Sequence, residues 1–170
     1  MMDKQLAFLF QFLIDALKDE LESFVRLLDV IREETQALRD NKLPEVIDIG
    51  IRKGHVFRQS EAAVQRRVDA VAKINAYLCL QDSLPFVELA SYTDAATRQI
   101  LTGYRDKFAD IVRRIKSANE TNRQIIALTL AQVSNNIKFI RNITASLPNY
   151  DRHGQVIARS LQGEVVSRAG

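Results

Sequence analysis

The sequence predicts an all-α protein, an elongated antiparallel three-helix coiled-coil bundle with one long C-terminal helix and a flexible tail. Three observations lead to this prediction. Helix breakers are scarce, with three prolines and six glycines in 170 residues. Apolar side chains recur at steps of three and four, the spacing of one helical face, and no stretch alternates with a period of two. The longest stretch, residues 94–147, contains no proline, and as one helix it would extend about 80 Å at ~1.5 Å per residue.

The first predicted helix keeps one apolar face over residues 6–38. Its members are Leu6, Phe10, Leu13, Leu17, Leu21, Phe24, Leu28, Ile31 and Leu38. Phe8 and Phe12 lie on the far side of this helix. Burying each phenyl ring is worth about 1.5–3 kcal/mol. We therefore expect the Pro85–Ala90 segment or another copy of the chain to cover them.

A turn ending at Pro44 separates this helix from a second one, which runs to about Leu80. Pro44 suits the first turn of a helix, because the backbone N–H that proline lacks would have no partner there. Apolar residues of the second helix are mixed with many charges, so we expect it to be half solvated. After it, Ser83 is expected to cap a short turn over Pro85–Ala90.

The long helix is expected to begin at Thr93 or Asp94, either of which can cap it. Its apolar stripe consists of Ile100, Tyr104, Phe108, Ile111, Ile115, Asn122, Ile126, Val133, Ile137, Ile140 and Leu147. We expect residues 126–140 of this stripe to be core first of all, with their flanks available to a bound partner. Asn119 and Asn122 either fix the register, as a buried asparagine does in coiled coils, or contact the partner. Replacing both with leucine is expected to keep or raise stability and to weaken partner binding.

Charge is distributed unevenly along the chain. Residues 1–40 carry 5 basic and 9 acidic side chains, whereas residues 41–81 carry 7 and 4, and residues 82–147 carry 9 and 6. An acidic first helix is therefore expected to lie beside two basic ones. Basic and acidic residues are interspersed and do not form one patch with stacking aromatics, which argues against nucleic-acid binding. The apolar run at residues 6–14 is too short to span a bilayer, so no membrane insertion is expected.

The sequence offers no catalytic arrangement, and we expect neither an enzyme nor a cofactor or metal site. The two histidines, His55 and His153, have no neighbour at metal-ligand spacing. Cys79 is the only cysteine, which fits a reducing cytoplasm, and its apolar neighbours predict a small buried side chain. The acidic run Asp19-Glu20-Glu22 is expected to be a solvated helix face. A phosphotransfer bundle using His55 remains a less favoured alternative.

Two motifs carry a family resemblance. The pair Asn119-x-x-Asn122 lies in the middle of the long helix, and Tyr150-x-x-x-Gly154-Gln155 follows some thirty residues later. Together and in this order they resemble the FlgN family of flagellar export chaperones. The resemblance implies a non-enzymatic cytoplasmic chaperone that holds C-terminal segments of the hook–filament junction proteins FlgK and FlgL. It also implies that Tyr150, with Gly154 and Gln155, docks on the export gate protein FlhA.

We expect a helical chaperone domain over residues 1–147 and a flexible tail over residues 148–170. Ordering the tail would cost about 1–2 kcal/mol per residue, which is more than its few apolar side chains return. Ile157, Leu161 and Val165 are spaced for one helical face, which is expected either to fold onto a client or to dock transiently on the long helix. The expected client contacts are Asn119, Asn122, Ile126, Val133, Ile137, Ile140, Ile157 and Leu161. A structural coiled-coil protein is the main alternative, and a homodimer is a further option.

Overall fold

The computed structural model describes residues 3–146, 149–150 and 156–157, with side chains to residue 143. Its elements are α1 (Lys4–Arg39), α2 (Leu43–Tyr77), α3 (Phe86–Leu89), the 3-10 turn η1 (Ala90–Tyr92), α4 (Ala95–Ser146), and the two-residue strands β1 (Asn149–Tyr150) and β2 (Val156–Ile157). The strands pair antiparallel, with Asn149 opposite Ile157. The predicted all-α class and the long final helix are confirmed. The chain forms two compact units, Met1–Ile126, here called the bundle, and Ala127–Gly170.

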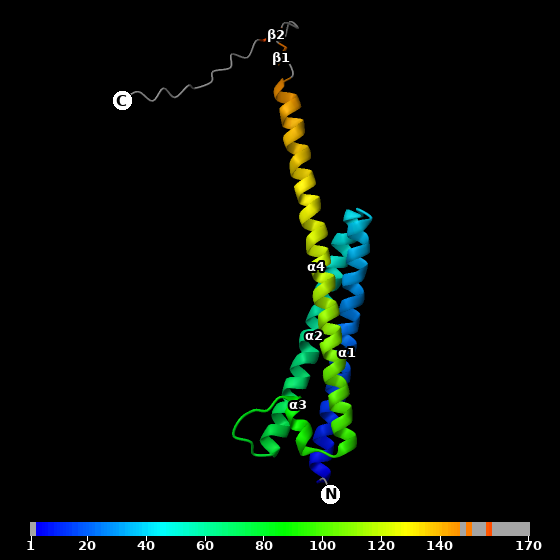
Figure 1. The fold of residues 1–170 in the computed structure, drawn as a ribbon, viewed down its shortest axis with the longest axis vertical. Helices are drawn as coiled ribbons and strands as arrows, with labels where there is room; N and C mark the ends of the chain where they lie inside the picture. The colour runs from blue at the N-terminus through cyan, green and yellow to red at the C-terminus, as the bar shows by residue number, and fades with distance from the viewer. Residues whose placement is uncertain (1–2, 147–148, 151–155, 158–170) are drawn as a thin grey trace, which may run out of the picture. The chain divides into compact units, whose positions relative to one another are not determined.

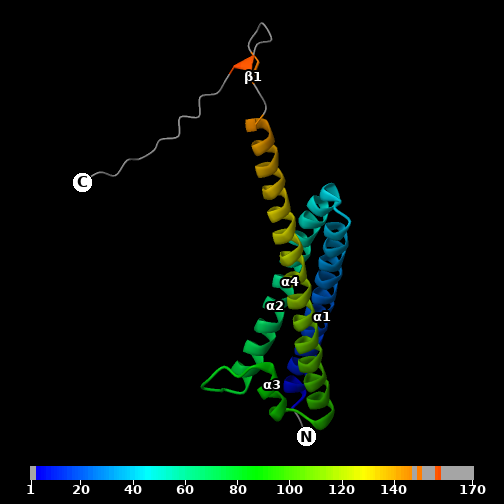
Figure 2. The ribbon, with the colours of Figure 1, turned by 45° about the horizontal axis from the view of Figure 1, so that its top comes forward.

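Within the bundle, α1 and α2 lie side by side (Figures 1 and 2). They run antiparallel, because residues early in α1 meet residues late in α2. Four ion pairs cross between them: Asp19–Arg66, Glu20–Arg67, Glu33–Arg52 and Glu34–Lys53. In each pair α1 supplies the carboxylate and α2 the cation. The acidic first helix therefore lies beside a basic second helix, as the charge distribution predicted.

Small side chains allow α1 and α2 to approach each other closely. The buried small residues are Ala16, Ser23 and Ala37 on α1, and Ser60, Ala63 and Ala70 on α2. The Ser60 hydroxyl lies 3.4 Å from the Ser23 carbonyl oxygen across this seam. Four large apolar residues of α2, Ile47, Ile51, Phe57 and Val68, are exposed. The half-solvated character of α2 is confirmed, and the face that it buries combines Ser60, Ala63 and Ala70 with larger residues such as Val71 and Ile74.

The main core lies where the start of α1, the end of α2, the α3–η1 segment and the start of α4 meet. Its fully buried side chains are Phe10, Leu13, Leu17, Ile74, Leu89 and Leu101. Further along, Phe24 of α1 and Phe108 of α4 meet edge to face, with ring centroids 5.9 Å apart. Ile100 belongs to the predicted apolar stripe of α4, but it is 45% exposed and Leu101 is buried instead. Both residues are apolar, so the spacing could not distinguish them.

Helix ends follow the expected chemistry with one exception. The carboxylate of Asp94 accepts a hydrogen bond from the Thr97 backbone N–H at 2.9 Å and so caps α4. Pro44 falls within the first two positions of α2, where its missing N–H costs nothing. The prediction for Ser83 is wrong, because Pro85 precedes α3 and no side chain caps it.

The backbone at the end of α2 determines the exposure of Cys79. This residue has a φ of 52°, in the left-handed region. The following N–H, of Leu80, donates to the Asn75 carbonyl at 3.2 Å, which closes the helix. This turn directs the thiol outward, so Cys79 is exposed and not buried as predicted.

The two phenylalanines on the far side of α1 have different surroundings. The prediction that Pro85–Ala90 covers them is wrong for Phe8, which is 70% exposed, because this segment inserts Leu89 into the core face of α1 instead. Phe12 lies under the Lys73 ammonium, 4.7 Å from the ring centroid, in a cation–π contact. Coverage of Phe8 by another copy of the chain stays a prediction.

The Tyr77 hydroxyl donates to the Asp3 carboxylate and ties the end of α2 to the start of α1. This bond lowers the pKa of Asp3 from its ordinary 3.8 and raises the pKa of Tyr77 from 10.0. The lowered pKa means that Asp3 stabilises the fold above pH 3.8 and that this contribution disappears as pH falls through the folded-state value. The raised pKa means that the contribution of Tyr77 is present below pH 10.0 and disappears as pH rises further.

Tyr77→Phe is therefore expected to lower the melting temperature slightly and evenly between these two limits, and to have no effect in stronger acid. Thermal unfolding of both proteins, followed by circular dichroism from pH 2 to 11, measures this difference. The difference should shrink as pH falls through the folded-state pKa of Asp3, and a difference that stays constant down to the lowest pH at which the protein is folded would contradict the assigned bond.

Candidate protein-binding surfaces

Asn122 lies in a polar layer inside the bundle and is 4% exposed. Its amide nitrogen donates to the Glu34 carboxylate at 2.8 Å, and its carbonyl oxygen lies 2.6 Å from the Thr35 hydroxyl. Glu34 also accepts from Lys53 of α2 at 2.5 and 2.6 Å. The layer thus connects α1, α2 and α4. Asn119 is exposed, so the two asparagines of the motif have different surroundings.

This geometry changes the stability expected when asparagine is replaced. Asn122→Leu removes a hydrogen bond to a buried carboxylate and is expected to lower the free energy of unfolding by about 1–3 kcal/mol. The sequence had led us to expect stability kept or raised. Urea unfolding gives the difference, with Asn119→Leu as the matched control, since an exposed substitution usually changes stability by less than about 0.5 kcal/mol. Equal unfolding midpoints for the two variants would show that the layer contributes nothing.

The second surface is the part of α4 that follows Ile126. Every side chain from residue 127 to residue 143 is exposed. The large apolar ones among them are Leu128, Leu130, Val133, Ile137, Phe139, Ile140 and Ile143. The prediction that residues 126–140 are core is wrong, because no second helix lies beside α4 among the described residues of the Ala127–Gly170 unit. A run of exposed apolar side chains of this length marks an interaction surface.

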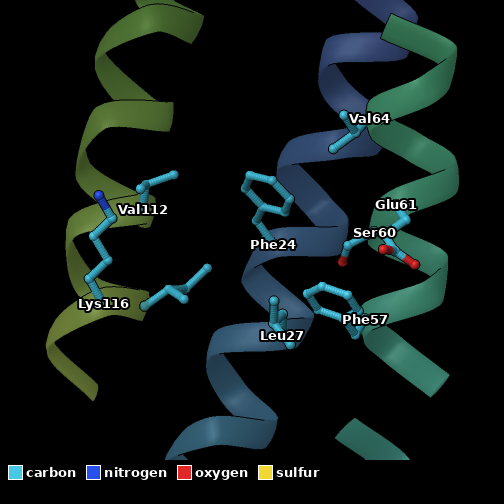
Figure 3. Close-up of a pocket in the computed structure, with 9 residues that line it drawn as sticks. Phe24, Leu27, Phe57, Ser60, Glu61, Val64, Val112 and Lys116 are labelled. Atoms are coloured by element: carbon cyan, nitrogen blue, oxygen red, sulfur yellow. The ribbon is translucent and has the colours of Figure 1, made fainter. Parts of the chain in front are cut away.

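The third surface is a groove of about 380 Å³ in the bundle (Figure 3). Its lining is Phe24 and Leu27 of α1, Phe57, Ser60, Glu61 and Val64 of α2, and Val112, Ile115 and Lys116 of α4. Figure 3 shows the α1 side chains between the other two helices, so α1 forms the floor and α2 and α4 form the walls. The accessible surface of the groove is almost entirely apolar. The groove was not predicted from the sequence, although the seven-residue spacing of Phe57 and Val64 could have indicated it.

Other predicted site residues lie where the structure describes little. Tyr150 is in β1 and Ile157 in β2, but only their backbones are described. Gly154, Gln155 and Leu161 lie outside the described residues, as does most of the predicted tail. Their roles therefore stay predictions. Ile126, at 42% exposed, is the last residue of the bundle and begins the exposed run of α4.

Groups with catalytic potential have structural partners. Glu20, predicted to be solvated, is 3% exposed and accepts from Arg67 at 2.6 Å, because α2 covers that face of α1. His55 is exposed on α2 with Nδ1 2.9 Å from an Arg58 guanidinium nitrogen. Within the described ranges no three His, Cys, Asp or Glu side chains are placed to hold a metal ion. No helix of that part of the chain is long and apolar enough to cross a membrane.

The family model described as "FlgN protein" matches residues 1–156, which is most of the chain. It covers all three long helices and both strands up to Val156. No curated protein and no solved structure matches significantly.

Proposed function

The chain belongs to the FlgN family, whose members are flagellar export chaperones, and from this membership we propose what the protein holds and where it delivers it. It is a cytoplasmic chaperone for C-terminal segments of FlgK and FlgL. It binds them without chemical change and brings them to the flagellar export apparatus. These clients and this route follow from the family resemblance.

The observation that carries the proposal is the exposed apolar run of α4 after Ile126. Val133 is 48% exposed and Ile137 is 46% exposed, and they lie one turn apart on one face. A client segment that is disordered when free can fold onto such a face as an amphipathic helix. Lys138 and Arg141 are the only charged residues between positions 124 and 146. A client with acidic residues beside its apolar face would therefore be favoured.

Titration calorimetry tests the proposal. Peptides spanning the last 40 or so residues of FlgK and FlgL from the same organism are titrated into the full-length protein. A 1:1 complex with a gain of helix in circular dichroism is expected. A stable oligomer of the chain that binds neither peptide would instead favour a structural coiled-coil protein.

Tyr150 provides the second contact of the proposed route. A phenol combines an apolar ring with one polar tip and suits a small docking surface. Tyr150→Ala is expected to leave client binding and the melting temperature unchanged and to weaken binding of the client-loaded chaperone to the FlhA cytoplasmic domain by about tenfold or more, as loss of an interface anchor does. Biolayer interferometry with Tyr92→Ala, an exposed tyrosine of η1, as the control measures this. Equal gate affinity for the two variants would assign Tyr150 to packing only.

A further inference from the structure

The groove of the bundle is open, apolar and has no role in the proposed client contact. Its lining comes from all three long helices, whereas the exposed run of α4 belongs to the other unit. Phe57 is 53% exposed on its α2 wall. The Ser60 hydroxyl is buried and donates to the Val56 carbonyl at 3.1 Å, so its hydrogen is not available to a polar ligand. The ligand that fits must present an apolar face.

The spacing of the lining residues matches a helix better than a small molecule. Phe57 and Val64 are two turns apart on α2, and Val112 and Ile115 are one turn apart on α4. Side chains repeated at these intervals form the holes into which a further helix inserts its own apolar residues. A helix seated between α2 and α4 would cover Phe57 and convert three helices into four.

Two opposite charges flank the groove. Glu61 stands on the α2 wall and Lys116 on the α4 wall. Neither forms an ion pair with another described residue. By contrast, the four carboxylates of α1 that face α2 are all paired. A bound helix would place one flank against the carboxylate and the other against the ammonium group.

We propose that this groove binds an amphipathic helix of a partner protein, one with acidic residues along one flank and basic residues along the other. The acidic flank faces Lys116 and the basic flank faces Glu61. Turning a helix end for end exchanges the walls that its flanks face. The two rim charges therefore also fix the direction in which the partner helix lies.

The test uses two synthetic amphipathic peptides of about 18 residues with the same leucine face. The first carries glutamate on one flank and lysine on the other, and the second has the flanks exchanged. A nitroxide at the peptide N-terminus identifies the direction by broadening nearby amide signals in nuclear magnetic resonance spectra. Phe108 lies near one end of the groove and Asn119 near the other. We expect the first peptide to broaden signals at one of these ends and the second peptide to broaden signals at the opposite end.

Exchanging the rim charges gives the decisive variant. Glu61→Lys with Lys116→Glu is expected to reverse the end reported by each peptide. Surface ion pairs are individually weak, so the two rim charges together should give a preference between directions of roughly twofold to thirtyfold. Identical broadening patterns for the two peptides, or no reversal in the variant, would overturn the role of the rim charges.

Substitutions on the α2 and α4 walls test whether the peptides bind in the groove. Val64→Asp and Val112→Asp are each expected to weaken peptide binding at least tenfold, whereas Val25→Asp, at an exposed valine of α1 outside the groove, should not. The titrations are repeated in Val133→Asp with Ile137→Asp, which removes the proposed client face, and peptide affinity should persist there. If this double variant loses affinity for the peptides, they bind the exposed part of α4 after Ile126. That result would overturn the groove proposal and leave the client proposal intact. Binding of a small apolar dye without binding of either peptide would also overturn it.

Discussion

Val133→Asp with Ile137→Asp is expected to abolish client binding without unfolding the protein. If a client helix buries both side chains, each contributes about 1.5–3 kcal/mol. Their loss would weaken the dissociation constant by roughly 10²–10⁴-fold. Both residues are about half exposed in the free chain, at 48% and 46%, so the melting temperature should hardly change. Calorimetric titration of the client peptides into the variant measures the loss.

The matched control lies on the same helix. Asn135→Asp with Asn142→Asp adds the same two charges at exposed polar positions on the opposite side of α4, and client affinity should fall much less. If both double variants bind equally weakly, added negative charge and not the apolar face would explain the loss. If neither loses affinity, the client binds elsewhere.

Leu101→Ala is expected to cause the largest loss of stability. Leu101 is fully buried and is the residue through which α4 enters the main core. Truncating a buried leucine to alanine costs about 2–5 kcal/mol, out of a total that is typically about 5–15 kcal/mol. Urea unfolding measures the loss, with Leu128→Ala as the control, because Leu128 is 72% exposed. Similar unfolding midpoints for the two variants would show that α4 is not anchored at Leu101.

Much of the helix arrangement could be predicted from the sequence. Regular spacing of large apolar side chains identified the buried face of α1, and proline with the cap at Asp94 located the breaks between helices. The errors arose where side-chain size or context decides burial. Alanine and serine are weak hydrophobic signals, so the small residues Ser60, Ala63 and Ala70 of the buried face of α2 were missed. Cys79 has apolar neighbours, but a left-handed backbone turns it outward.

The binding surfaces were harder to predict because an apolar stripe looks the same whether another helix covers it or not. Ile111 and Ile137 belong to one continuous stripe of α4, yet Ile111 is 4% exposed and Ile137 is 46% exposed. Burial of a stripe residue depends on whether another helix lies against it, and the spacing of apolar residues along α4 does not show this. The motif asparagines show the same ambiguity, since periodicity alone could not tell buried Asn122 from exposed Asn119.

The close packing of α1 against α2 determines which helix of the bundle moves most easily. These two helices share small buried residues and four ion pairs. The α4 helix is attached to them through fewer, mostly larger, side chains and leaves a groove beside α2. Regions with fewer buried contacts open first and most often in native proteins. Amide protons of α4 should therefore exchange with solvent sooner than those of α1 and α2. If α4 loosens while α1 and α2 stay packed together, the groove can widen around an incoming helix.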